Sequence, residues 1–276
     1  MSRLPAGILT FVLLAAEWPS AGAESLFTPL EPLPRPKIVR SAEAYPGGGY
    51  NAENLLDGRF GGGPRSEYAS AGKGLETFVD FDFGRPARIA AFQHVDRMDP
   101  ATVASADLIF SDAADFAKPL AKVPVQHANT RGGVTCASFP PVTARYVRWQ
   151  VTALGPQKYG TVGGAEIAFF TALEPEATPS RVKLAVRGLP SVVLQHGKPA
   201  RSIEVTVDYP YAERVEASLE LAGVTPIGLG LSLGTHKVET ALPALDPERP
   251  VSAALKIAGR PVAESRQALK PVRPWV

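Results

Sequence analysis

The chain has 276 residues, with 29 Lys and Arg against 27 Asp and Glu, and its formal net charge of +2 excludes the concentrated basic face that nucleic-acid binding requires. Apolar residues make up 45% of the chain, which excludes wholesale disorder and leaves enough for a hydrophobic core. The 27 prolines and 25 glycines exclude long helices and favour many short strands joined by turns.

The first 23 residues have the three parts of a secretory signal peptide. Arg3 provides a positive start, residues 4–16 are apolar, and residues 21–23 provide the small side chains of a cleavage site. The apolar run is shorter than the ~20 residues that span a bilayer, and no later segment approaches that length. We therefore expect export to the periplasm, the cell surface or the medium, with no membrane span after cleavage.

The cysteine content and the glycosylation sites indicate what kind of organism the protein comes from. Cys136 is the only cysteine, so no intrachain disulfide can form despite the exported context. The chain also has no Asn-x-Ser/Thr acceptor site for glycosylation. Both features favour a bacterial protein whose fold depends on its core alone.

Two β-rich segments follow the leader. Residues 24–36 contain four prolines and predict an extended, unpacked tether. A first domain is expected over residues 37–172, with one brief helix at 51–56. Its strands are expected at residues 75–83, 87–95 (after a turn at 84–86), 106–111, 144–151 and 165–170.

The alternation within these strands predicts the core. Val79, Phe81 and Phe83 share one parity, whereas Asp80 and Asp82 take the other and are expected on a solvated face. Such alternation is typical of two antiparallel sheets that bury one face each. The side chains expected in this core are Val79, Phe81, Phe83, Ile89, Trp149 and Ile167.

A polar, proline-bearing stretch at residues 173–180 predicts a linker. Residues 181–276 then show short strands at regular spacing with no helical pattern, and an immunoglobulin-like β-sandwich is the expected fold of such a segment.

Five motifs of the first domain occur in the order of a known family. They lie at residues 50–58, 66–68, 78–84, 144–148 and 165–167. Together they resemble the discoidin, or coagulation factor 5/8 type C, family, and in particular its galactose-binding-like carbohydrate-binding modules. The resemblance covers about residues 37–172. It implies an antiparallel jelly-roll β-sandwich of eight strands, with Tyr68 in the core.

The resemblance also implies a structural calcium ion. Asp57 and Glu166 would provide carboxylates and Ser66 a hydroxyl, since Ca²⁺ prefers oxygen ligands. Alternatively, Asp57 only forms a turn and Glu166 lies on the solvent-exposed face of a strand. The loop between Asp57 and Ser66 is longer than is usual in the family, and Arg59 and Arg65 within it could replace the ion by pairing with the carboxylates.

Members of this family that bind sugars do so with loops at one end of the sandwich. The resemblance makes Arg97 and Tyr159 the main candidate ligand-binding residues, with His94, Asp96 and Lys73 as neighbours. Polar groups would bind sugar hydroxyls and an aromatic ring would cover the apolar sugar face. Other residues typical of the sugar-binding members are absent, so Arg97 could instead anchor its own loop.

No catalytic motif has a supporting context. The Gly-x-Ser-x-Gly pattern at residues 230–234 resembles a nucleophile elbow, but Ser232 lies between expected strands rather than before a helix. The four histidines do not occur at metal-ligand spacing. The chain is therefore predicted to be non-catalytic.

We expect an exported binding protein that recognises carbohydrate or another cell-surface ligand. Two alternatives stay open. The ending at residues 269–276 is similar to the stretch before the catalytic domain of some α-mannosidase-type glycoside hydrolases, which would make the chain an accessory fragment with a downstream catalytic domain. Alternatively, the chain is a structural adhesion module with no small ligand.

Overall fold

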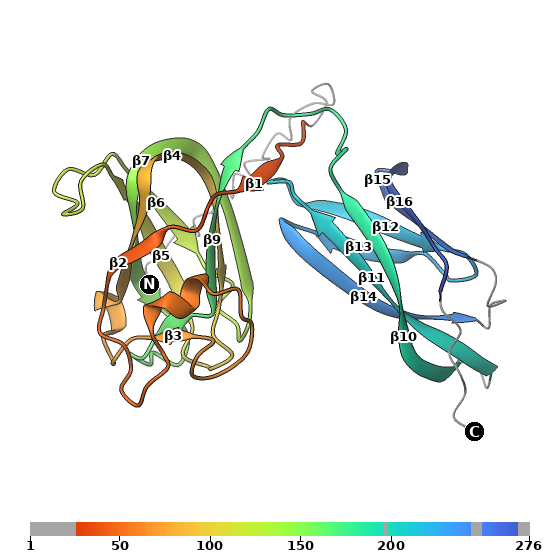
Figure 1. The fold of residues 1–276 in the computed structure, drawn as a ribbon, viewed down its shortest axis with the longest axis horizontal. Coiled ribbons are helices and arrows are strands. Elements are labelled where there is room, and N and C mark those ends of the chain that lie inside the picture. The colour runs from red at the N-terminus through yellow and green to blue at the C-terminus, as the bar shows by residue number, and fades with distance from the viewer. Residues whose placement is uncertain (1–25, 196–197, 244–249, 270–276) are drawn as a thin grey trace, which may run out of the picture.

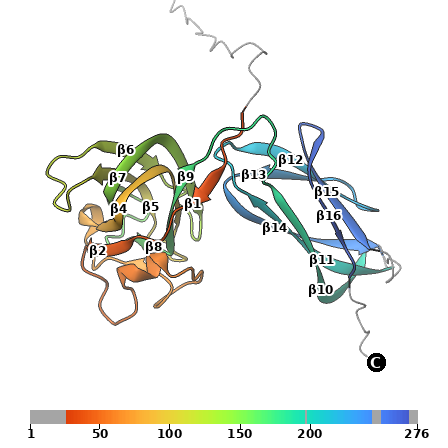
Figure 2. The same ribbon diagram turned by 45° about the horizontal axis from the view of Figure 1, so that its top comes forward.

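The structure is a computed structural model that describes residues 26–195, 198–243 and 250–269. Over these ranges the chain forms two β-sandwiches (Figures 1 and 2), and every strand pairing is antiparallel. The expected all-β fold is thus confirmed. The predicted signal peptide at 1–23 and, apart from Leu269, the ending at 269–276 lie outside the described residues. Within the described ranges, no helix has the length and hydropathy to cross a membrane.

The first sandwich is built around two long strands, β4 (Phe78–Val95) and β7 (Val134–Leu154), which pair along most of their length. Their pairing continues into both layers, so one seven-stranded hydrogen-bonded network forms both faces. The other strands of the network are β1 (Leu30–Pro32), β2 (Lys37–Ser41), β5 (Val103–Ser111), β6 (Ala121–Gln126) and β9 (Glu166–Ala172).

The two layers use different halves of the long strands. The first half of β4 pairs with β2 and with the second half of β7, which also pairs with β5. The second half of β4 pairs with β9 and with the first half of β7. Short elements close the lower end in Figure 1: η1 (Ala52–Leu56) and η2 (Gly74–Glu76), which are 3₁₀ helices, and the strand pair β3 (Tyr68–Ala69) and β8 (Gly163–Gly164).

The turn predicted at residues 84–86 is a bend within β4. Pairing with β7 is interrupted between Asp82 and Ala87, and Gly84 has φ = 76°, which a side chain disfavours. The irregularity turns the strand from one layer into the other, as the arch at the top of the first sandwich shows (Figure 1). Proline and glycine here bend a strand instead of ending it.

The predicted core is largely confirmed. Val79, Phe81, Ile89 and Trp149 are fully buried, Tyr68 is fully buried as the resemblance implies, and Phe83 is partly buried against the same cluster. The expectation for Asp80 is wrong, because this carboxylate is buried. It pairs with Arg148 (2.6 Å) and Arg40 (2.9 Å).

The proline-rich segment is not an unpacked tether. Leu30–Pro32 forms β1 and pairs with β9, and the Leu30 side chain is buried. On its other edge the segment binds the second sandwich, since the Leu30 N–H donates to the Pro210 carbonyl (2.7 Å) and the Ala212 N–H donates to the Thr28 carbonyl (3.2 Å). Prolines lack only their own N–H, so their neighbours can still complete a strand at a sheet edge.

The second sandwich has a three-stranded and a four-stranded sheet packed around one core that includes Ile203, Val205, Leu219 and Leu255. The first sheet has the order β10-β11-β14 and the second the order β13-β12-β15-β16. The strands are β10 (Lys183–Gln195), β11 (Lys198–Tyr209), β12 (Val215–Leu221), β13 (Ile227–Leu231), β14 (Gly234–Pro243), β15 (Val251–Ile257) and β16 (Arg260–Gln267).

A small apolar cluster joins the two sandwiches. Leu30, Ala91 and Phe170 of the first half pack with Leu233 of the second. The Cys136 thiol donates to the Leu233 carbonyl (3.3 Å). The joint therefore lies at the β1–β9 end of the first sandwich, and the loops at the opposite end stay clear of it (Figure 1).

Candidate functional site

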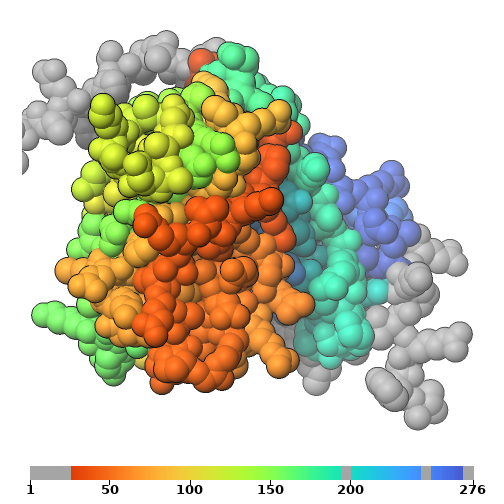
Figure 3. All heavy atoms as spheres, turned by 60° about the vertical axis from the view of Figure 1, so that its left-hand side comes forward, coloured from red at the N-terminus to blue at the C-terminus, as the bar shows by residue number. Residues whose placement is uncertain are grey.

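Six loops converge at the end of the first sandwich that lies away from the joint. Backbone hydrogen bonds tie them together: Gly74 donates to Gly160 (2.8 Å), and Gly132 donates to Arg97 (2.9 Å). Figure 3 shows part of this end, where the residues coloured red to orange cover the lower side of the visible face. We call these segments the rim loops; they are residues 45–50, 57–66, 70–74, 97–102, 127–133 and 155–162.

The rim loops carry the exposed aromatic side chains. Among the large hydrophobic side chains that the described residues leave exposed, three are aromatic: Tyr45 (46% exposed), Phe60 (70%) and Tyr159 (51%). All three lie on rim loops. Aromatic rings at a surface are costly to leave in water and are typical of binding surfaces.

Lys73 is also at this surface and is paired with Glu43, with 2.8 Å between Nζ and Oε2. The hydrogen bond and the opposite charge raise the pKa of Lys73 and lower the pKa of Glu43. Of the predicted ligand-binding residues, Tyr159 and Lys73 are thus the two with side chains that a ligand can reach.

Arg97 lies beneath the rim loops and not on them. Its guanidinium is buried, donates to Glu67 (3.2 Å) and to the Thr161 carbonyl (3.0 Å), and lies over the Tyr50 ring. Glu67 is buried as well and accepts the Met98 N–H (2.6 Å). The geometry favours the alternative in which Arg97 anchors its loop.

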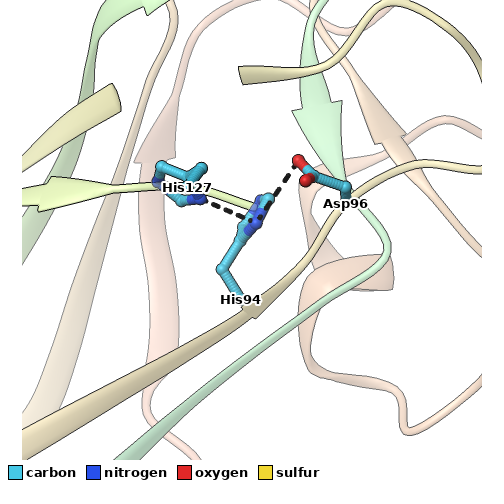
Figure 4. A group of neighbouring side chains, drawn as sticks. All are labelled: His94, Asp96 and His127. Carbon is cyan, nitrogen blue, oxygen red and sulfur yellow. Dashed lines mark hydrogen bonds and ion pairs between the residues drawn. The ribbon is translucent and has the colours of Figure 1, made fainter. Parts of the chain in front are cut away.

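His94 and Asp96 are fully buried, so neither side chain is open to a ligand on the rim. Together with His127 they form a compact group below it (Figure 4). The Nδ1 atoms of His94 and His127 are 3.0 Å apart, and His94 Nδ1 is 3.8 Å from Asp96 Oδ1. Asp96 Oδ1 and His94 Nε2 have no hydrogen-bond partner.

Burial controls the charges in this group. Loss of solvent lowers the pKa of His94 well below its usual value, assisted by the charge of His127, and lowers the pKa of His127 to about 4. The same loss of solvent raises the pKa of Asp96 to about 6, although backbone N–H groups oppose the rise. Both imidazoles are therefore neutral at pH 7, and each keeps a nitrogen lone pair.

The residues predicted to hold calcium are only partly brought together. Glu166 lies close enough to Asp57 for their charges to interact, and its Oε2 accepts the Gly58 N–H (2.9 Å). Burial, with a smaller contribution from the Asp57 charge, raises the pKa of Glu166 to about 7, against the lowering effects of the Gly58 N–H and Arg35. The Ser66 hydroxyl instead donates to the Gly61 and Gly63 carbonyls of its own loop.

This donor set fits Ca²⁺ in its chemistry. Asp57 and Glu166 are neighbouring carboxylates, and the raised pKa of Glu166 shows that its ionised form is disfavoured. A divalent cation would stabilise that ionised form, and both carboxylates offer the oxygen ligands that Ca²⁺ prefers. The pairing of Arg59 and Arg65 with the carboxylates is not what the structure shows. The arginine that acts on Glu166 is Arg35, which sequence reasoning did not consider.

Two buried residues of the site were missed from the sequence, Glu67 and His127. Glu67 follows Ser66 in the recognised motif, but no local pattern pairs it with Arg97, which is 30 positions away. His127 is 33 positions from His94, so their contact depends on how β4 and β6 are placed in space. The rim aromatics Tyr45 and Phe60 were also missed, although their glycine-rich surroundings indicate loops.

Comparisons with known proteins give likeness at the level of solved structures only. No protein-family model and no curated protein matches the chain. A chitosan-binding module of a Paenibacillus sp. IK-5 chitosanase/glucanase is 20% identical, with 49% of this chain and 94% of that one covered and a TM-score of 0.37. A putative chitobiase fragment from Bacteroides thetaiotaomicron is 16% identical, with 52% and 93% covered and a TM-score of 0.43. Discoidin II of Dictyostelium discoideum is 13% identical, with 74% and 91% covered and a TM-score of 0.40.

Proposed function

We propose that this protein is an exported, non-catalytic carbohydrate-binding protein whose rim loops contact the glycan. The observation that carries the proposal is the location of Tyr45, Phe60 and Tyr159, the exposed aromatic side chains noted above, on one end of the first sandwich. A sugar ring has an apolar face that stacks on an aromatic ring and hydroxyls that bind polar groups around it. The motifs shared with the discoidin family support the same proposal.

The polar contacts would come from the groups beside these rings. Lys73 of the rim loops forms an exposed ion pair with Glu43, which lies just outside these loops, and both groups could form hydrogen bonds with sugar hydroxyls. Arg97 is a positioning residue in this proposal, because its guanidinium is used by Glu67 and Thr161. Its removal would disturb the loop before it removed a sugar contact.

We also propose a structural calcium ion at Asp57 and Glu166, and an immunoglobulin-like assignment for the second sandwich. The strand order supports the immunoglobulin-like assignment. One sheet contains the first, second and fifth strands of this half (β10, β11 and β14), and the facing sheet contains the fourth, third, sixth and seventh (β13, β12, β15 and β16). In this proposal the second sandwich serves as a spacer behind the binding end.

A glycan array followed by calorimetry tests the function. The wild type is expected to bind a defined glycan class, and Tyr159→Ala should weaken that binding about tenfold, or ~1.4 kcal/mol, as for a contact at the centre of an interface. Leu120→Ala is the matched control, because Leu120 is similarly exposed but lies outside the rim loops. Equal affinity of Tyr159→Ala and wild type, or no glycan bound at all, would favour the structural adhesion alternative.

A further inference from the structure

The buried group of His94, Asp96 and His127 has no role in the rim surface, and its composition is unusual for a β-sandwich core. Two imidazoles and a carboxylate lie within one another's reach, with their ligand atoms all within 4.8 Å of each other. Interiors normally pair such groups fully with hydrogen-bonding partners. Here Asp96 Oδ1, the carboxylate oxygen nearest His94, is left without a hydrogen-bond partner.

The Nδ1 atoms of the two imidazoles face each other (Figure 4). The Trp149 indole N–H donates to His127 Nε2 (3.3 Å), so His127 carries its proton on Nδ1 and directs it at His94 Nδ1. His94 Nδ1 then holds a lone pair that points into the group, and its Nε2–H points toward the Gly164 backbone, where a Cβ would collide with it. His94 is thus in the tautomer that a metal on Nδ1 requires.

Asp96 is held in place by its other oxygen. Asp96 Oδ2 accepts the Thr130 N–H (3.4 Å), which leaves Oδ1 directed at His94 without a partner. Carboxylates that bind metals are usually held in this way, with one oxygen fixed by a hydrogen bond and the other available to the metal.

We propose that His94, Asp96 and His127 form a buried site for one divalent transition metal ion of the zinc class. Imidazole and carboxylate are the ligand types that Zn²⁺ takes, and three protein ligands leave one tetrahedral position for water. The Nδ1 atoms are 3.0 Å apart, and two nitrogens that share a tetrahedral ion at the ~2.0–2.1 Å of a zinc–nitrogen bond lie ~3.3–3.4 Å apart. The two rings would therefore separate by a few tenths of an ångström and turn their Nδ1 atoms toward the ion. The ion would replace the His127 Nδ1 proton, which would move to Nε2. Because Nε2–H would then face the Trp149 indole N–H, that hydrogen bond would be lost and the two rings would have to move apart.

The site would join the rim loops from below. His94 is the second-last residue of β4, Asp96 directly precedes the 97–102 loop and His127 begins the 127–133 loop. An ion shared by them fixes both loops to the strand behind them. This role is independent of glycan binding and of the carboxylate pair at Asp57 and Glu166.

The experiment uses the whole protein without a histidine tag, stripped of metal by chelator and returned to buffer with excess Ca²⁺ to saturate oxygen-only sites. Zinc is added and measured by mass spectrometry after gel filtration, and by calorimetry. The wild type should retain one zinc per chain. Asp96→Asn and His127→Gln should each lose more than the ~10–100-fold in affinity that an outer-shell change costs.

Two further readouts separate this site from adventitious binding. His236→Ala, a histidine substitution in the second sandwich, should retain zinc as the wild type does. Co²⁺ should quench the fluorescence of Trp149, whose ring centroid is 5.3 Å from that of His94, in wild type and His236→Ala but not in Asp96→Asn. Wild type that is folded by circular dichroism yet binds zinc no more tightly than Asp96→Asn overturns the proposal.

Discussion

At the scale of single residues, the ion pair of Arg97 and Glu67 is the most consequential contact under the rim. Both side chains are buried, so Arg97→Ala leaves a carboxylate without its partner. We expect a loss of about 3–5 kcal/mol in the free energy of unfolding, measured with urea, because breaking one half of a buried pair strands the other charge.

The double variant Arg97→Met, Glu67→Leu is the control for this prediction. It removes both charges together, and it should unfold less readily than Arg97→Ala. An Arg97→Ala protein as stable as the wild type would show that the pair is solvated in solution.

Glu166 gives a prediction that depends on pH. Its pKa of about 7 in the folded protein is above its usual value near 4.5, so the folded state holds a proton that the unfolded state has lost between those values. Without metal, the contribution of Glu166 to stability is therefore largest in acid and falls as pH rises to about 7. Glu166→Gln should gain stability relative to wild type over that range, measured by thermal melting in EGTA.

Calcium should reverse this trend. The ion binds the ionised carboxylate, so it stabilises the wild type increasingly as pH rises from 5 to 8, and it should leave Glu166→Gln unchanged. A wild-type melting temperature that is the same with Ca²⁺ and with EGTA at pH 8 would contradict the calcium proposal.

At this scale the sequence could indicate which residues belong to the site, but not whether their side chains are buried or exposed. His94, Asp96 and Arg97 were identified because they stand in one short motif. Their burial depends on His127, Glu67 and Trp149, which come from distant parts of the chain. No local pattern reports such partners, so a buried group was predicted as a surface site.

At the scale of elements, alternation was a reliable guide where one face of a strand meets the core. Val79 and Phe81 are buried as their parity predicts. Asp80 has the opposite parity and is buried too, because it pairs with Arg40 and with Arg148, whose guanidinium lies over the Phe116 ring. Period-two patterns describe the strand itself, whereas coverage of the second face comes from long side chains of neighbours.

Glycine and proline were harder to interpret than the alternation. The glycine and prolines at residues 84–86 and 29–36 predicted segments without regular strand structure. Residues 84–86 instead bend the continuous strand β4, and residues 29–36 contain the strand β1. Both residue types are compatible with bulges and sheet edges as well as with turns. Choosing between these outcomes requires the partner strand, which is distant in sequence.

At the scale of the whole molecule, β1 and the cluster around Leu30 determine how the two sandwiches are joined. Leu30→Asp places a charge among Ala91, Phe170 and Leu233, and the cluster cannot solvate it. We expect the joint to loosen while both sandwiches stay folded. Small-angle X-ray scattering should show a larger radius of gyration, and residues 173–182 should be cleaved faster by protease.

Leu26→Asp is the matched control, since Leu26 belongs to the same segment but is exposed. It should leave both measurements as in the wild type. A Leu30→Asp protein with unchanged scattering and cleavage would mean that the backbone bonds of β1 suffice to hold the two halves together.

The antiparallel pairing of β1 with β9 has a mechanical consequence. The amino end of β1 lies beside the carboxyl end of β9, and the bridges of Phe27 to Glu176 and Pro29 to Tyr211 come before it along the chain. Tension that draws residue 26 away from the second sandwich would load these contacts in succession, beginning with Phe27, instead of all together in shear. The segment would peel off at low force and lengthen the molecule before either β-sandwich began to unravel.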